Sequence, residues 1–159
     1  MTSRPLAGTV SLRPMRWADI ERVCTMEREL FDDTPWTPEQ FWSEIAEVPA
    51  TRWYTVAERQ GLVVGYAGLM TVSRDADVQT VAVAQADQGQ GIARLLMTAL
   101  VQEARSRGCT SLMLEVGVDN EPACHLYRVL GFVDVSRRRD YYAPGVDAMV
   151  MRLRLGAVS

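Results

Sequence analysis

The sequence predicts one α/β (α+β) domain, in which helices flank a mixed, mostly antiparallel central sheet. Helical and strand-like segments follow one another in the order β-α-α-β-β-β-α-β-α-β-β, and short turns join several strands into hairpins. A strand–helix–strand unit near the middle of the chain requires a parallel strand pair. The length of 159 residues and a hydrophobic content of 48% agree with a single domain over residues 1–159.

The N-terminal third has one strand followed by two helical segments. Residues 9–15 alternate as a strand does, and apolar residues recur at helical spacing over 17–31. The stretch "DDTPW" interrupts this pattern. Thr37, Pro38 and Gln40 then form a capping-box start, with proline at the first helical position. The second helix is therefore expected to begin immediately after Thr37.

The remaining elements are bounded by turn and capping signals. The turn "RQG" separates two strands, Gly108 ends the long central helix, and Asn120 and Gly131 bracket a shorter helix. The expected strands cover residues 52–58, 62–72, 77–84, 110–116, 132–139 and 147–155, and the expected helices cover 91–107 and 121–130.

Composition excludes several classes of function. A net charge of −3 argues against general binding to nucleic acid, which needs a basic face. No stretch reaches the roughly 18 apolar residues of a membrane span, and the N-terminus lacks the apolar core of a signal peptide, so we expect a cytoplasmic protein. Three scattered cysteines without a C-x-x-C pair predict neither a disulfide framework nor a metal site.

The segment "QGQGIA", Gln88 to Ala93, has the features of an anion-binding turn. Its two glycines allow a ligand to approach the backbone, and the following helix presents unpaired N–H groups and a positive dipole end. The segment lacks the lysine and hydroxyl residue of a nucleotide-hydrolysing phosphate loop, and no acidic residue follows at dinucleotide-fold spacing. We therefore expect this segment to bind a pyrophosphate group without catalysing phosphoryl transfer. A glycine-rich turn that binds no ligand has the same sequence pattern and is the alternative.

Two motifs resemble the GNAT superfamily of N-acetyltransferases. Gln88, Gly91 and Ala93 fill the family's Q/R-x-x-G-x-G/A pattern, and the stretch from Asn120 to Phe132 matches N-x-x-A-x-x-L-Y-x-x-x-G-F. The resemblance runs from about residue 10 to residue 153. It implies a GNAT fold whose parallel strand pair is splayed to admit acetyl-CoA, in a single N-acetyltransferase domain.

The resemblance also assigns the residues that contact the cofactor. In the family, the loop wraps the pyrophosphate, and the preceding strand pairs with the pantetheine arm and polarises the thioester carbonyl through a backbone N–H. No metal takes part. The cofactor-binding residues so implied are Val81, Ala82, Val83, Gln88, Gly89, Gln90, Gly91, Ile92, Ala93, Arg94 and Asn120.

Acetyl transfer to an amine needs a base for the amine and an acid for the departing thiolate. Glu115 lies between apolar residues in "LMLEV", where burial would suit it to act as a base, directly or through water. The resemblance gives Tyr127, two helical turns after Asn120, the role of general acid. A solvent-facing Glu115 without a role and a core Tyr127 are the alternatives. His125, the only histidine, occupies a position that is not catalytic in the family motif.

Two further stretches resemble the RimI-type ribosomal protein S18-alanine N-acetyltransferases within this superfamily. These are "DDTPWTPEQFWSEI" and "RRRDYYAPGVDAMVMRL", and they imply that Trp36, Tyr141 and Tyr142 contact a peptide. The implied acceptor is a protein N-terminus, that of ribosomal protein S18. An α-amine has a pKa near 7.7–8.0, against about 10.4 for lysine, so a single glutamate is a sufficient base.

One departure from that group concerns the substrate. The group often has "EVRxSN", whereas this chain has "EVGVDN", so Gly117 removes a basic side chain and Asp119 adds an acidic one. We therefore expect relaxed specificity for N-termini. An acetyltransferase for lysine side chains or small amines is one alternative, and a noncatalytic acyl-CoA-binding module is another. A pure binder needs neither Glu115 nor Tyr127.

Overall fold

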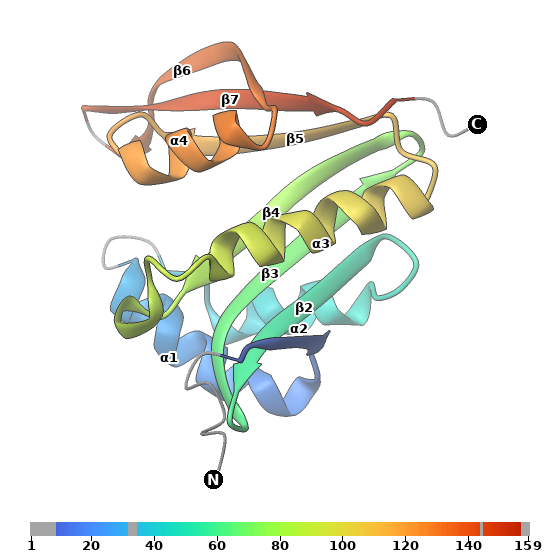
Figure 1. The fold of residues 1–159 in the computed structure, drawn as a ribbon, viewed down its shortest axis with the longest axis vertical. Helices are drawn as coiled ribbons and strands as arrows, with labels where there is room; N and C mark the ends of the chain where they lie inside the picture. Colours follow the sequence, from blue (N-terminus) through green and yellow to red (C-terminus); the bar gives the residue numbers. More distant parts are fainter. Residues whose placement is uncertain (1–8, 32–34, 144, 157–159) are drawn as a thin grey trace, which may run out of the picture. The chain divides into compact units, whose positions relative to one another are not determined.

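The computed structural model describes residues 9–31, 35–143 and 145–156, and its elements follow the predicted order (Figure 1). The strands are β1 (Ser11–Pro14), β2 (Arg52–Arg59), β3 (Leu62–Val72), β4 (Asp75–Val83), β5 (Ser111–Gly117), β6 (Val133–Ala143) and β7 (Val146–Arg154). The helices are α1 (Ile20–Leu30), α2 (Pro38–Ala46), α3 (Ile92–Ser106) and α4 (Glu121–Val129), with short 3-10 turns η1 (Trp17–Asp19) and η2 (Gln85–Asp87).

The strands form a mixed sheet in the order β1-β2-β3-β4-β5-β7-β6. β4 and β5 are parallel, with registered pairs from Asp75–Ser111 to Asp77–Met113, whereas the pairs β1–β2, β5–β7 and β6–β7 are antiparallel. Helix α3 makes the crossover that a parallel pair requires. The predicted fold class, a mixed and mostly antiparallel sheet with one parallel pair, is confirmed.

The chain forms two compact units. One contains Met1–Leu69 and Thr80–Leu100, and the other contains Met70–Gln79 and Val101–Ser159. The elements β3, β4 and α3 therefore contribute residues to both. Within the described residues, no helix is both long enough and apolar enough to cross a membrane.

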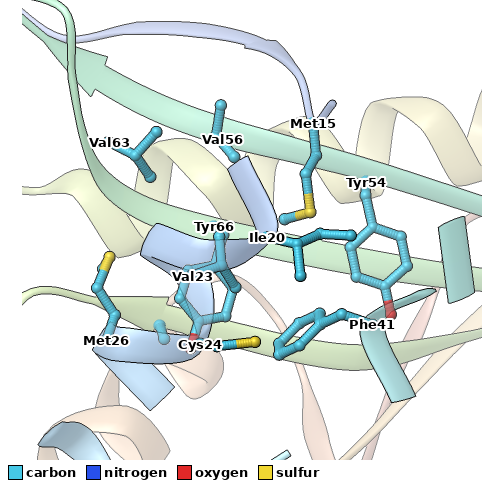
Figure 2. Close-up of a cluster of buried hydrophobic side chains, with 11 residues drawn as sticks. Met15, Ile20, Val23, Cys24, Met26, Phe41, Tyr54, Val56, Val63 and Tyr66 are labelled. Atoms are coloured by element: carbon cyan, nitrogen blue, oxygen red, sulfur yellow. The ribbon is translucent and has the colours of Figure 1, made fainter. Parts of the chain in front are cut away.

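The core of the first unit lies between α1 and the strands β2 and β3 (Figure 2). Ile20, Val23 and Cys24 recur at the spacing of one helical face and point toward Tyr54 and the neighbouring strand residues. Helix α2 adds a fully buried phenylalanine at position 41. The labelled members of the cluster are Met15, Ile20, Val23, Cys24, Met26, Phe41, Tyr54, Val56, Val63 and Tyr66.

A buried carboxylate connects α1 to the sheet and to the segment before α2. Glu27 is only 2% exposed, and it accepts hydrogen bonds from the Tyr66 hydroxyl at 2.7 Å and the Trp36 backbone N–H at 2.8 Å. Burial, and secondly the neighbouring Glu27, raise the pKa of Tyr66, so this hydroxyl stays protonated and donates. The buried carboxylate therefore fixes the backbone at Trp36.

Helix α2 begins where the capping box predicts. The Thr37 hydroxyl accepts the Gln40 N–H at 3.2 Å, and the Gln40 side chain accepts the Thr37 N–H at 2.8 Å. The ring of Trp36 packs against Phe41 with the ring centroids 5.1 Å apart. The Tyr54 hydroxyl, which donates to Glu44 at 2.6 Å, connects α2 to β2.

In the second unit, the β6–β7 hairpin lies beside β5, and α4 lies along these strands (Figure 1). Leu114 and Val116 are buried on one face of β5, and the alternation of a strand places Glu115 on the other face. The Asn120 side chain caps α4 by accepting the Ala123 N–H at 3.3 Å. The cysteines at 24, 109 and 124 are buried and free, as their scattered positions predicted.

We predict that Glu27→Ala lowers the free energy of unfolding by about 3 kcal/mol, because it leaves the Tyr66 hydroxyl and the Trp36 N–H buried without an acceptor. Urea unfolding measures the change. Glu29, which is exposed on the same helix, is the matched control, and Glu29→Ala should change the free energy by less than about 0.5 kcal/mol. Equal effects of the two substitutions would contradict a structural role for the buried carboxylate.

Candidate active site

The loop between η2 and α3 has the geometry of an anion-binding turn. Gly89 and Gly91 have φ angles of 79° and 83°, in the left-handed region that favours glycine, and no other atom lies within 4 Å of a Cβ built at either position. The Gln88 side chain donates to the Val83 carbonyl at 3.1 Å and so ties the loop to the end of β4. Helix α3 begins at Ile92, directly after this turn. The backbone of the loop is open to a ligand, and the first N–H groups of the helix have no intrahelical acceptor.

Arg59, which the sequence reasoning missed, supports this loop. It is the last residue of β2, and its guanidinium donates to Asp87 in η2 and to Gln90 in the loop. The Arg59 side chain is only 15% exposed, and its Nε is buried without a hydrogen-bond partner within the described residues. The ion pair with Asp87 and the hydrogen bond to Gln90 therefore connect β2 to both η2 and the loop.

The end of β4 is positioned by close packing with β3 and α3. A Cβ at Gly65 of β3 would lie 3.1 Å from both the Ala82 carbonyl oxygen and a methyl carbon of Leu96. Glycine at this position therefore allows β3, β4 and α3 to approach one another. After Val83, the chain remains attached to β3 through the Ala84 N–H, which donates to the Val64 carbonyl at 2.9 Å. A role for residues 81–83 toward a pantetheine arm stays a prediction.

Glu115 has a different environment from the one its apolar sequence neighbours indicated. Its side chain is 38% exposed, and Oε1 accepts a charge-assisted hydrogen bond from Arg138 Nη1 at 2.9 Å. The apolar neighbours Leu114 and Val116 point to the opposite face of β5 because side chains alternate along a strand. The carboxylate is thus paired with a cation instead of being desolvated, and the sequence reasoning missed Arg138.

A second carboxyl group lies close to Glu115. Asp77 of β4 pairs in register with Met113, which lies on the same face of β5 as Glu115. Burial, then the charge of Asp75 and then that of Glu115 raise the pKa of Asp77. Glu115 therefore lies near a second acidic side chain, that of Asp77, and is paired with Arg138.

Helix α4 presents its candidate acid on its buried side. Tyr127 is 6% exposed, and its ring centroid lies 5.9 Å from that of Phe132. His125 is exposed and borders a hollow of about 360 Å³ that Cys124, Arg128 and Met149 also line. The burial of Tyr127 agrees with either a core position or a protected acid, so its role stays a prediction.

The predicted peptide contacts fall in both units. Trp36 of the first unit is partly buried against Phe41, and its backbone is held by Glu27. Tyr141 of the second unit is 58% exposed, and the Arg138 guanidinium carbon lies 4.3 Å from its ring centroid. Tyr142 lies on β6, and its side chain is outside the described part of the chain, as are residues 32–34 of the "DDTPW" stretch.

The first unit thus contains the glycine turn predicted to bind a pyrophosphate, the end of β4 and the N-terminus of α3. The second unit contains Glu115, Asn120, Tyr127 and Tyr141. No group of three or more histidine, cysteine, aspartate or glutamate side chains able to hold a metal ion occurs in the described ranges.

Comparison with known proteins identifies an acetyltransferase family and several N-acetyltransferases as similar to this chain. The acetyltransferase (GNAT) family model matches residues 6–132. The N-alpha-acetyltransferase RimI of Mycobacterium tuberculosis is 39% identical over 149 residues, which cover 90% of this chain and 91% of that protein. The ribosomal protein bS18-alanine N-acetyltransferase of Escherichia coli K12 is 33% identical over 122 residues, 75% of this chain and 80% of that one. The crystal structure of the ribosomal-protein-S18-alanine N-acetyltransferase from Escherichia coli superposes with a TM-score of 0.86 at 26% identity, covering 95% and 97% of the two chains.

We predict that Arg59→Ala weakens the binding of coenzyme A by about tenfold, because the loop loses the side chain that fixes Asp87 and Gln90. Isothermal titration calorimetry measures the dissociation constant. Arg52 is a matched control, since it lies at the other end of β2 and is also ion-paired, with Glu44 at 2.9 Å. Equal losses for Arg52→Ala and Arg59→Ala would contradict a specific role for Arg59.

Proposed function

The chain belongs to the GNAT family of acetyltransferases, and we propose that it acetylates the N-terminal α-amine of a protein, with ribosomal protein S18 as its substrate. It is an acyltransferase that uses acetyl-CoA as the acetyl donor. The observation that supports the α-amine as acceptor is similarity, over 90% of this chain, to a protein named an N-alpha-acetyltransferase. Similarity in both sequence and structure to the S18-alanine N-acetyltransferase of Escherichia coli supports the specific substrate.

Acetyl-CoA, when bound, supplies the acetyl group as a thioester. We assign its pyrophosphate to the backbone of residues 88–93, where the left-handed glycines and the unpaired N–H groups of α3 suit an anion. Gln88 and Arg59 hold this loop in shape. Residues 81–83 would pair with the pantetheine arm, and one of their backbone N–H groups would polarise the thioester carbonyl.

We assign proton removal from the acceptor amine to Glu115. Its Oε1 is taken by Arg138, and from the described residues Oε2 receives neither a hydrogen bond nor an ion pair, so this oxygen can accept a proton directly or through one water. An α-amine has a pKa near 7.7–8.0 and is partly neutral at pH 7.5, so a partly exposed carboxylate is a sufficient base. A lysine amine, with a pKa near 10.4, would demand a stronger one.

We assign protonation of the departing thiolate to the Tyr127 hydroxyl. The burial of the tyrosine excludes bulk water from this proton transfer. Asn120 uses its side-chain oxygen to cap α4, which leaves its amide N–H groups to contact the cofactor arm.

Three aromatic residues are proposed to contact the peptide. The Tyr141 ring is exposed on β6, and the buried Glu27 orients the Trp36 backbone, while Tyr142 is included because of its place in the sequence pattern. Gly117 and Asp119, which depart from the pattern of the group, support a range of accepted N-termini wider than S18 alone. Because the proposed substrate is a ribosomal protein, we propose that the enzyme acts in the cytoplasm. The alternative acceptors are lysine side chains and small amines.

We predict that Glu115→Gln lowers kcat by about 100-fold with little change in coenzyme A affinity, because it removes the base but preserves the shape of the site. Steady-state kinetics with an N-terminal peptide and calorimetry with coenzyme A provide the two readouts. Glu103→Gln is the control, since Glu103 is also a partly exposed, ion-paired glutamate, with Arg107 at 2.8 Å. Full turnover by Glu115→Gln would refute the assignment.

We predict that Tyr127→Phe lowers kcat by about 10-fold to 100-fold, because the buried ring is kept and only the proton donor is lost. The thermal unfolding midpoint reports whether the fold survives. A variant that retains wild-type kcat would make Tyr127 a core residue, the structural alternative.

The substrate is tested with a panel of peptides that share the S18 sequence and differ only in the first residue. Alanine should give the highest kcat/KM, and other small first residues should be accepted at lower rates because specificity is relaxed. Turnover by S18 peptides no faster than by unrelated peptides would refute S18 as the substrate. Transfer only to polyamines or other small amines would favour the alternative.

A further inference from the structure

The ion pair between Glu115 and Arg138 joins a residue of the proposed site to one that no sequence motif assigned. The Nη1–Oε1 distance is 2.9 Å, and the side chains are 38% and 50% exposed. The Arg138 guanidinium also stacks over Tyr141, with its central carbon 4.3 Å from the ring centroid. The arginine is therefore held from two sides.

The strand register explains how Arg138 of β6 reaches Glu115 across the intervening strand β7. Arg138 pairs with Ala148, and Ala148 pairs with Gly117. Gly117 lies on the same face of β5 as Glu115 because side chains alternate along a strand. Ala148 and Gly117, which lie in line with Arg138 on this face, bear only a methyl group and a hydrogen atom, which leaves room for the long arginine side chain to reach Glu115 diagonally.

Other charged side chains lie on the same face of the sheet as Glu115. Asp77 of β4 interacts with Glu115, and Arg152 of β7 pairs in register with Met113 and so lies on this face as well. Arg138 differs from both because it contacts the Glu115 carboxylate directly, at 2.9 Å.

We propose that Arg138 is a positioning residue for acetyl transfer: it holds Oε1 of Glu115 and directs Oε2 toward the acceptor amine. This inference rests on the proposed function, because it assigns a role through Glu115. A half-exposed ion pair contributes little to folding stability, so the effect of Arg138 falls on turnover.

Kinetics with an alanine-starting peptide provide the first test. Arg138→Ala should lower kcat by about five- to tenfold with little change in KM, and Arg138→Lys should recover part of the loss, because lysine restores the charge without the planar fork. Arg137→Ala is the matched control, since Arg137 is the neighbouring residue and is ion-paired with Asp147 at 2.8 Å. Wild-type kcat in Arg138→Ala, or an equal loss in Arg137→Ala, would overturn the proposal.

Carbon-13 NMR of glutamate side-chain carboxyl groups provides a second test that does not depend on turnover. The Glu115 signal is identified by its loss in Glu115→Gln. In Arg138→Ala this signal should change its chemical shift at neutral pH, because Oε1 loses its hydrogen-bond donor. An unchanged chemical shift would overturn the proposal. If wild-type protein acetylates no peptide, the proposed function fails, whereas normal turnover with no Arg138 effect refutes only this inference.

Discussion

Strand β4 pairs in parallel with β5 over a short register, from Asp75–Ser111 to Asp77–Met113, and the other features of the molecule depend on this pairing. Parallel neighbours cannot be joined by a tight turn, so a crossover of some length is required. Helix α3 provides it, and the N-terminus of this helix follows the glycine turn that we assign to the pyrophosphate. Beyond the registered pairs, β5 continues to Glu115, the proposed base. One topological constraint thus links the proposed cofactor loop to the strand that bears the proposed base.

The residues proposed to contact ligands are held by residues that do not contact them. Arg59 fixes the glycine turn through Asp87 and Gln90, Glu27 fixes the backbone of Trp36, and Arg138 holds one oxygen of Glu115. Glu27 and Arg59 use charged groups in buried or partly buried positions, where a missing partner would cost more free energy than at the surface, whereas Arg138 is half-exposed. These contacts hold the proposed site residues in place before the substrate binds. The free-energy cost of ordering those residues on binding is therefore lower.

Local features of the fold were predictable from the sequence, whereas the supporting contacts were not. The Thr37–Gln40 capping box, the end of α4 near Gly131 and the turn at Gln88 each depend on residues a few positions apart. Asp87 lies 28 residues from Arg59, Glu115 lies 23 from Arg138, and Tyr66 lies 39 from Glu27, so strand register and packing decide these contacts. The environment of Glu115 was misjudged for a related reason: its apolar neighbours occupy the opposite face of β5.

The central claim is that this GNAT enzyme transfers acetyl to a protein α-amine. The most direct measurement uses one peptide that begins with alanine and contains an internal lysine, incubated with acetyl-CoA and the enzyme. Both amines then compete within the same molecule, and tandem mass spectrometry locates the added acetyl group. The account predicts acetylation of the N-terminal nitrogen with the lysine unmodified. Acetylation of the lysine alone, or of neither nitrogen, would contradict it.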